Sequence, residues 1–370
     1  MTLKGKGFFI WKIKNCEGGN ANKIAIEAKA AGLSHVLIKI ANGIYSYNYD
    51  WDKKVDLIPP VAQALRSMGI KVWGWHYVYG DNPVSEARIA IKRVQELGLD
   101  GYLINAESQY KQSGKKTAAK QFMRELKGGL GNSVPIALSS YRYPSLHPIP
   151  WNEFLEKCDY NMPQVYWIHA HNSGAQLAQS LREFESPKFK YHPPIIPTGA
   201  AFREHGWEAT SHESVEFLET ARALNLSAAN FWAWYSCRTQ LTPKLKSWNA
   251  IANYNWESGV TPQDITGEYI DALNTHDVEK VVSLYSDRAV HVSSAGTLFG
   301  KANIRGWYNT IFNLMLPNAT FGLTGFSGTG NSRHFTWTAQ SAQHQVNNGN
   351  GTFGLSDDKI TYHYSSFTVT

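Results

Sequence analysis

The sequence predicts a mixed α/β protein in two parts, an N-terminal (β/α)8 barrel and a smaller α+β domain. Eight short apolar runs alternate with amphipathic segments over the first 256 residues, and such alternation at intervals of about 30 residues is typical of this barrel. The pattern changes after residue 256, where a helix-rich stretch is followed by alternating strands. We therefore expect a barrel over residues 1–256, a linker over residues 257–264 and a second domain over residues 265–370.

Short apolar runs between helical segments indicate the buried strands of a parallel sheet. The predicted strands lie at residues 7–13, 34–43, 70–80, 101–108, 134–143, 160–167, 193–202 and 228–237. Three of the helical segments end at Gly32, Gly69 and Gly98, where a helix C-cap is expected. A doubly wound open sheet is the alternative, but no Gly-rich phosphate loop follows the first strand.

The second part has the pattern of a small α+β domain. Residues 261–287 predict two helices, residues 289–294 a strand and residues 301–316 a helix. Strands with Gly and Asn turns follow at residues 319–326, 332–343 and 349–370. This order predicts a curved antiparallel sheet with helices beside it.

The composition favours a ligand-binding protein. Aromatic residues make up 13% of the chain and include 13 Trp, more than a core usually needs and typical of surfaces that bind flat apolar faces. The net charge of +6 suits an anionic partner, but Lys and Arg are scattered and no nucleic-acid motif is present. A solvated basic surface is the interpretation we prefer, and no nucleic-acid partner is expected.

The sequence leaves the cellular location undetermined. Lys12 and Lys14 interrupt the first apolar stretch after four residues, which is too short for a signal peptide, so the protein is expected to be cytoplasmic or exported by a non-classical route. No run of 18 apolar residues exists, and no membrane span is expected. The three cysteines are far apart and are interpreted as free thiols.

Polar and aromatic side chains gather at the predicted C-terminal ends of the barrel strands, where such barrels carry their chemistry. Aromatic rings stack on the C–H faces of sugars, and Asn, Gln and Tyr hydrogen-bond sugar hydroxyls. The pattern therefore predicts a carbohydrate site without a metal or cofactor. The candidate substrate-binding residues are Trp75, Tyr77, Asp81, Tyr141, Arg142, Gln164, Trp232 and Trp234.

Glu107 is the candidate catalytic acid. Its strand has a period of two, so Asn105 and Glu107 are expected to point together towards the barrel axis. A carboxyl group among Trp and Tyr loses hydration, which raises its pKa towards that of a general acid at neutral pH. The alternative is an ion-paired or solvated loop carboxylate.

The segment from Asp100 to Glu107 resembles the strand-four motif DGxDxDxE of family-18 chitinases, and more broadly that of family-25 lysozymes. Met162, Gln164 and Tyr166 resemble the Met-x-Tyr-Asp region of the chitinases without its acid, and Trp232 falls where that family places a Trp beneath the sugar. The resemblance implies a barrel that hydrolyses O-glycosidic bonds. Glu107 would be the general acid, and Asn105 and Tyr166 would position the substrate.

Asn105 stands where the chitinase motif has an Asp that orients the substrate's N-acetyl group. If substrate assistance is lost, a second carboxylate is needed, and the candidates are Asp50, Asp81 and Glu204. Two hypotheses remain open. The first is a glycosidase acting on a chitin-like or peptidoglycan-like polysaccharide, and the second is a non-catalytic carbohydrate-binding or assembly protein on a degenerate hydrolase barrel.

Residues 266–292 and 299–312 resemble the SnoaL-like branch of the nuclear transport factor 2-like (NTF2-like) superfamily. The resemblance implies a cone-shaped α+β fold, and its members commonly form dimers through their sheets. The carboxylates Asp271, Asp277 and Asp287 are expected on helix surfaces or loops. We therefore expect a binding or oligomerising domain, although a C-terminal active site remains an alternative.

Overall fold

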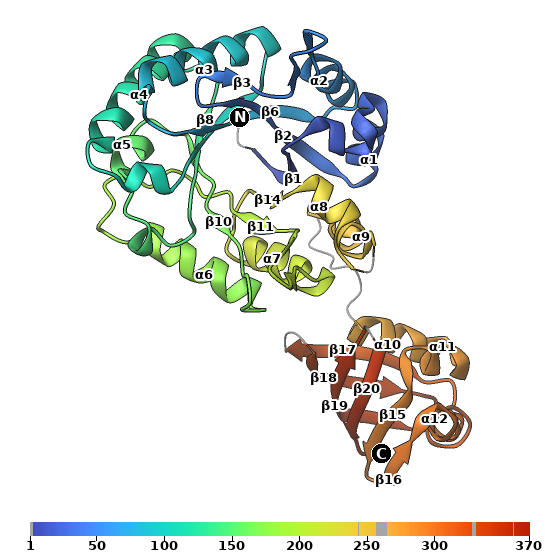
Figure 1. Ribbon diagram of the computed structural model, residues 1–370. Coiled ribbons are helices and arrows are strands. Elements are labelled where there is room, and N and C mark those ends of the chain that lie inside the picture. The colour runs from blue at the N-terminus through green and yellow to red at the C-terminus, as the bar shows by residue number, and fades with distance from the viewer. Residues whose placement is uncertain (1–2, 243, 257–264, 328–330, 358) are drawn as a thin grey trace. The chain divides into compact units, whose positions relative to one another are not determined.

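The computed structural model describes residues 3–242, 244–256, 265–327, 331–357 and 359–370. Contacts divide the chain into two compact units, residues 1–260 and 261–370 (Figure 1). The predicted linker, residues 257–264, lies outside the described residues.

The N-terminal unit contains a parallel sheet that curves as a half-barrel (Figure 1). Its strand order is β10-β11-β14-β1-β2-β6-β7-β8-β9, and each of the eight predicted runs overlaps at least one of these strands. The strands are β1 (Gly5–Ile10), β2 (Leu33–Asn42), β6 (Lys71–Val78), β7 (Gly101–Ala106), β8 (Ile136–Ser139), β9 (Tyr160–Asn161), β10 (Gln164–Val165), β11 (Thr198–Ala200) and β14 (Ala228–Trp232).

Short antiparallel pairs lie outside this path. β3 (Tyr45–Ser46) pairs with β2, β4 (Tyr49–Asp50) with β5 (Val55–Asp56), and β12 (Arg203–Glu204) with β13 (Trp207–Glu208).

Helices alternate with these strands along the chain. The α-helices are α1 (Ala21–Ala30), α2 (Ile58–Ser67), α3 (Pro83–Leu97), α4 (Lys115–Leu130), α5 (Trp151–Leu155), α6 (Ser173–Phe184), α7 (Ser211–Ala223), α8 (Trp234–Thr239) and α9 (Lys246–Asn253). The 3₁₀ turns are η1 (Ile13–Asn15), η2 (Glu17–Gly19), η3 (Ser108–Lys111) and η4 (Pro144–Leu146). Gly98 ends α3 in the left-handed conformation at φ 55°, as the sequence predicts.

Alternate residues of each strand face different cores. On β2, Val36 and Ile38 pack against the surrounding helices, whereas Leu37 packs with Trp73, Trp75 and Leu103 on the concave side of the sheet. By the same period, Lys39, Tyr77 and Asn105 belong to the concave set. The period of two therefore decides which side chains reach the interior of the half-barrel.

The C-terminal unit has one six-stranded sheet, in the order β16-β15-β20-β19-β18-β17. All neighbours are antiparallel except β15 and β20. Its elements are α10 (Ile265–Asn274), α11 (Val278–Ser283), β15 (Tyr285–Ser293), β16 (Gly296–Phe299), α12 (Gly300–Thr310), a π-helical turn η5 (Ile311–Met315), β17 (Thr320–Ser327), β18 (Ser332–Gln340), β19 (Gln345–Ser356) and β20 (Lys359–Ser366).

The sequence did not predict β16. This strand has only four residues, most of them exposed, so it lacks the alternation of apolar and polar residues that marks the other strands.

The helices of the C-terminal unit bury Tyr269, Ile304 and Tyr308 against Phe335 and Trp337 of the sheet.

Candidate functional site

A cavity of about 410 Å³ opens on the concave side of the half-barrel, at the C-terminal ends of its strands. Glu107, the residue after β7, lines this cavity together with Asn105 of the same strand. The full set of lining residues is Trp11, Lys39, Trp75, Tyr77, Asn105, Glu107, Ser108, His147, Gln164, Tyr166 and Trp232. The structure thus brings together seven of the residues singled out from the sequence: Trp75, Tyr77, Asn105, Glu107, Gln164, Tyr166 and Trp232.

Amide groups hold the Glu107 carboxylate. Gln164 Nε2 donates to Glu107 Oε1 at 2.6 Å, and the side-chain oxygen of Asn105 also lies within 3.0 Å of that Gln164 nitrogen. With its amide turned the other way, Asn105 Nδ2 donates to Glu107 Oε1 at 3.0 Å and to the backbone oxygen of Ser139 at 3.3 Å. Glu107 therefore has amide partners on β7 and β10.

Burial governs the protonation of this group. It raises the pKa of Glu107, and the hydrogen bonds from Gln164 and Asn105 and the charge of Lys111 oppose the rise only in part. Burial, with the nearby Glu107 charge, also holds the pKa of Tyr166 well above its usual range. Tyr166 is therefore a neutral hydroxyl beside a carboxyl group whose pKa is raised by burial.

Three tryptophans form the apolar wall of the cavity. The rings of Trp75 and Trp232 meet edge to face at 5.3 Å, and Trp11 lies 6.0 Å from Trp232. Trp75 Nε1 donates to the backbone oxygen of Ile10 at 3.0 Å, which fixes this indole against β1. Trp11 remains 48% exposed, so the wall continues from the cavity to the surface.

Four predicted substrate-binding residues lie outside the lining of this cavity. Trp234 has no exposed surface, because α8 begins at this residue and turns its ring against Phe8 and Trp248. Asp81 pairs with Lys115 at 2.6 Å. The structure therefore does not bring Trp234 or Asp81 to this cavity: the Trp234 ring is packed in the core, and Asp81 is paired with Lys115.

Tyr141 and Arg142 belong to a neighbouring cluster. Tyr141 stacks on the cavity residue His147 at 5.5 Å. The guanidinium of Arg142 lies over the rings of Tyr141 and Tyr143, and its Nε donates to Gln176 Oε1 at 2.9 Å. These contacts let Arg142 support the rim of the cavity through His147.

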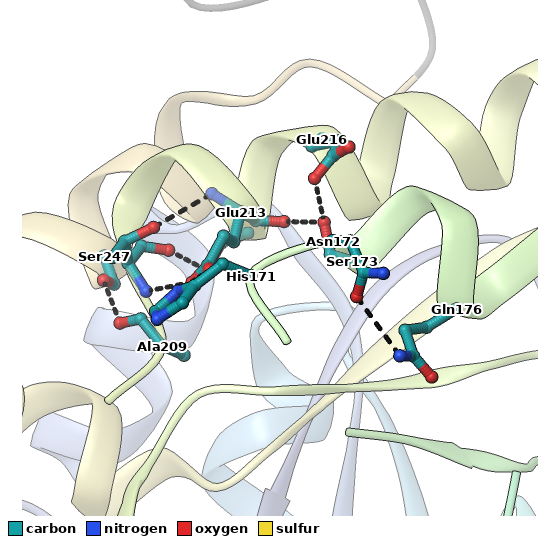
Figure 2. A network of polar contacts seen from close by, with 10 residues as sticks. His171, Asn172, Ser173, Gln176, Ala209, Glu213, Glu216 and Ser247 are labelled. Atoms are coloured by element: carbon teal, nitrogen blue, oxygen red, sulfur yellow. Dashed lines mark hydrogen bonds and ion pairs between the residues drawn. The ribbon is translucent and has the colours of Figure 1, made fainter. Parts of the chain in front are cut away.

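The polar network in Figure 2 holds the helix that carries Gln176. Gln176 Nε2 donates to Asn172 Oδ1 at 3.2 Å, and Ser173 Oγ donates to Glu216 Oε2 of α7 at 2.6 Å. His171 Nδ1 lies 2.5 Å from Oε1 of Glu213, and Glu213 completes the N-terminal capping box of α7. His171 thus links the segment that precedes α6 to α7.

The carboxylates considered as partners of Glu107 lie elsewhere. Asp50 pairs with Lys14 at 2.9 Å, Asp81 with Lys115, and the exposed Glu204 lies on the β12–β13 hairpin. Among the described residues that line the cavity, Glu107 is the only carboxylate.

Sequence reasoning missed four lining residues, namely Trp11, Lys39, Ser108 and His147. Lys39 belongs to the concave face of β2, two residues from Leu37, so the strand period was a usable signal. Burial, reinforced by the charge of Lys111, lowers the pKa of His147 to about 4, which keeps its ring neutral at pH 7.

The core of the C-terminal unit contains a chain of buried polar side chains. Tyr308 OH lies 2.8 Å from Tyr269 OH and 2.6 Å from Tyr285 OH. Tyr285 OH in turn lies 2.6 Å from His363 Nδ1. His291 stacks on His363 with ring centroids 4.4 Å apart. Burial raises the pKa of each tyrosine and lowers that of each histidine, so the chain is neutral.

Neither a cluster of metal-binding side chains nor a membrane-spanning helix is found in the described parts of the chain. No group of three or more His, Cys, Asp or Glu is arranged to hold a metal ion there. None of the helices described combines the length and apolar character needed to cross a membrane.

Comparison with known proteins identifies the C-terminal domain. Residues 267–363 match the family model of the SnoaL-like domain, and this unit is a SnoaL-like, NTF2-like domain as its sequence indicates. The family match does not extend into the N-terminal unit. No curated protein matches the chain.

Solved structures similar to the chain share little sequence with it. An NTF2-like protein of unknown function from Cytophaga hutchinsonii is 16% identical, with 30% of this chain and 94% of that chain covered and a TM-score of 0.25. A hypothetical protein with a ketosteroid isomerase-like fold from Catenulispora acidiphila, in complex with trimethylamine, is 17% identical, with 29% and 85% covered and a TM-score of 0.26.

Proposed function

We propose that the N-terminal unit is a complete (β/α)8 barrel whose sixth strand is divided by Pro163 into β9 and β10. Backbone hydrogen bonds support this closure: Gln164 N donates to Ser140 O at 2.8 Å, and Thr198 N donates to Pro163 O at 2.9 Å. Parallel bridges also join Tyr141 to Gln164 and Asn161 to Ile195. The divided strand would then lie between β8 and β11.

We propose that this barrel is a glycoside hydrolase with Glu107 as its general acid. The observation that carries the proposal is a single carboxyl group with a raised pKa in a cavity lined by Trp75, Trp232 and Tyr166. Indole and phenol rings match the C–H faces of sugars, and a raised pKa brings a carboxyl group closer to the range that a general acid needs.

The absence of a second carboxylate from the described lining favours substrate assistance over a two-carboxylate mechanism. Glu107 donates its proton to the glycosidic oxygen while the C1–O bond breaks. The carbonyl oxygen of the sugar's own 2-acetamido group attacks C1 and forms a cyclic oxazolinium. Glu107, now ionised, takes a proton from water as that water opens the ring and restores the acetamido group.

Tyr166 and Asn105 would orient the acetamido group. The neutral Tyr166 hydroxyl can donate to the acetamido carbonyl, and the Asn105 amide can accept from the acetamido N–H or donate to its oxygen. This chemistry limits the proposed substrates to polysaccharides with N-acetylated sugars.

A second candidate function is binding without hydrolysis. It is favoured by Asn105, because an amide cannot take up the positive charge that develops on the acetamido nitrogen as a carboxylate does. The same aromatic cavity would then hold a cell-wall glycan or a related polysaccharide, and the barrel would serve recognition or assembly.

Turnover of chitin and peptidoglycan by the full chain and by Glu107→Gln separates the two functions. A hydrolase should release reducing ends, and Glu107→Gln should lower that rate by about 10²-fold or more while glycan binding persists. Binding of glycans by the wild type without any turnover would remove the hydrolase proposal and leave the binding function. Full turnover by Glu107→Gln would show that Glu107 is not the acid.

We also propose that the SnoaL-like domain forms a dimer of the chain through its sheet. Tyr362 and Tyr364 of β20 support this proposal, because both are more than 40% exposed on the outer face of the sheet. Sedimentation equilibrium should give a dimer that Tyr362→Lys dissociates, and a monomeric wild type at all concentrations would contradict it.

A further inference from the structure

Lys39 is a buried cation in the wall of the cavity. It lies on β2, is 5% exposed, and its Nζ donates to Asn42 Oδ1 at 2.9 Å. Within the described residues, Lys39 forms no ion pair with a carboxylate. An ammonium group has three donors, so one amide oxygen leaves most of its hydrogen-bonding capacity unused.

Aromatic rings surround this ammonium group. Its Nζ lies 4.3 Å from the ring centroid of Tyr47, 4.7 Å from Trp75, 5.7 Å from Trp11 and 5.8 Å from Tyr77. Aromatic faces attract a cation and thus favour its charged form inside the protein. Trp11, Trp75, Tyr77 and Lys39 all line the cavity that contains Glu107, so the rings direct the ammonium to the same space as the acid.

Glu107 and Lys39 have different hydrogen-bond partners among the described residues: Gln164 donates to the carboxylate, and the ammonium donates to Asn42. The cation that lowers the pKa of Glu107 is Lys111, and the charge that acts on Lys39 is that of Lys12. The cavity therefore has a proton donor at Glu107 and a separate positive charge at Lys39. A buried charge without a counter-ion costs free energy, which an incoming anion would recover.

We propose that the cavity binds a sugar unit that carries a carboxylate, and that this carboxylate pairs with Lys39 Nζ. The inference rests on the proposed glycan-binding function and narrows its substrate class to acidic glycans. The Trp75 and Trp232 rings would take the sugar face, Lys39 its carboxylate and Glu107 the glycosidic oxygen of the neighbouring bond.

Because Lys39 must be protonated to attract a carboxylate, the affinity of the site for an acidic sugar should depend on pH. Burial, assisted by Lys12, lowers the pKa of Lys39 to about 8. The other groups that face it are Asn42, which does not titrate, and the phenols Tyr47 and Tyr77. Lys39 is therefore charged at neutral pH, and affinity for an acidic sugar should weaken as the pH rises above about 8.

The test uses the full chain and Trp fluorescence, since three indoles line the cavity. The probes are oligosaccharides of hyaluronan and of peptidoglycan glycan strands, each compared with the same oligosaccharide after reduction of its carboxylates to alcohols. We expect at least one acidic form to bind about tenfold more tightly than its reduced form at pH 7. This preference should fall between pH 8 and pH 10.

Lys39→Met should abolish the preference, so that this variant binds the acidic and the reduced form with equal affinity. Lys12→Met, which removes an exposed neighbouring charge, should retain most of the preference. Lys39→Arg should retain it and remove its loss above pH 8, because the guanidinium stays charged.

Equal affinity of wild type for acidic and reduced forms, binding of no acidic form, or a preference that survives in Lys39→Met would overturn the inference. Turnover of neutral N-acetylated glycans without any acidic preference would refute the inference alone. An acidic preference without turnover would instead refute the hydrolase and leave the Lys39 site intact.

Discussion

The side-chain amide of Asn105 can form a hydrogen bond with Glu107 in either protonation state of the carboxyl group. An ionised Glu107 is satisfied when Asn105 Nδ2 donates to Oε1 at 3.0 Å. A protonated Glu107 can instead donate to the Asn105 side-chain oxygen, which then also accepts from Gln164 Nε2 at 3.0 Å. Rotation of one amide thus serves both protonation states, which is what an acid that gives up and regains a proton requires.

Replacing Asn105 by Asp should raise the pKa of Glu107 further. A second negative charge within about 3 Å disfavours ionisation of the first, because like charges repel strongly in a buried site. In the hydrolase, the alkaline limb of the pH profile of kcat/KM should therefore move to higher pH in Asn105→Asp. Measured release of reducing ends between pH 4 and pH 9 gives this limb directly.

The control for this experiment is Asp81→Asn, since Asp81 pairs with Lys115 outside the cavity lining. That variant should leave the limb in place. An unchanged limb in Asn105→Asp would mean that the two side chains do not share the proton-binding site.

Trp232 and Trp234 should have separable roles although only one residue lies between them. Trp232→Ala removes a cavity wall and should weaken glycan binding by about tenfold or more, with a smaller effect on stability. Trp234→Ala removes a fully buried ring and should lower the free energy of unfolding by about 3–5 kcal/mol. Chemical denaturation and glycan titration of both variants measure the two effects.

Folded Trp234→Ala should keep the wild-type dissociation constant. If it loses binding as Trp232→Ala does while its near-ultraviolet circular dichroism stays native, the ring of Trp234 contributes to the site after all.

At the level of elements, the contact between β1 and β2 depends on Gly7, which has no side chain. A Cβ on Gly7 would lie 2.2 Å from Nε2 of the buried His35. His35 cannot move away easily, because its Nδ1 lies 2.8 Å from Ser34 Oγ and its Nε2 lies 2.6 Å from Asn230 Oδ1. This histidine joins β2 to β14 across β1, and Gly7 makes the room for it.

Gly7→Ala should therefore lower the free energy of unfolding by about 1–3 kcal/mol or more, measured by urea denaturation. Gly128→Ala is the matched control: Gly128 lies within α4 and has no neighbour within 4 Å of an added Cβ. It should stabilise the protein by about 0.5–1 kcal/mol, since Ala favours a helix over Gly. Equal effects of the two variants would contradict the steric argument at Gly7.

The strands were predictable from sequence because their apolar runs are local signals, and the period of two placed Asn105 and Glu107 correctly on one side of β7. Trp234 lies outside the cavity lining because that period ends where α8 begins. Asp81 also lies outside it, paired with Lys115, which is 34 residues away in the sequence. Lys39 was missed because its burial depends on rings from several strands, and no local pattern shows that a lysine is enclosed.

At the scale of the whole molecule, both units bury neutral histidines. Burial lowers the pKa of His35 to about 4 and of His76 to about 3 in the N-terminal unit. It lowers the pKa of His291 to about 4, and that of His363 well below its usual range, in the C-terminal unit. The two units share this property although their folds differ.

Acid should therefore destabilise both units. In the unfolded chain a histidine binds a proton below about pH 6.5, whereas these folded sites do not, so the unfolded state binds more protons as the pH falls. Above pH 6.5 these histidines are neutral in both the folded and the unfolded state, so they do not change the free energy of unfolding. The free energy of unfolding decreases between pH 6.5 and about pH 4, by up to about 3 kcal/mol for each of His35 and His291.

Calorimetry of the full chain from pH 7 to pH 5 should show every unfolding transition move to lower temperature. His291→Asn should reduce the number of protons taken up in one unfolding transition by about one, whatever its effect on absolute stability. His205→Asn, at a largely exposed side chain, should change neither the stability nor its slope. A transition that keeps its temperature across this range would contradict the argument for the unit concerned.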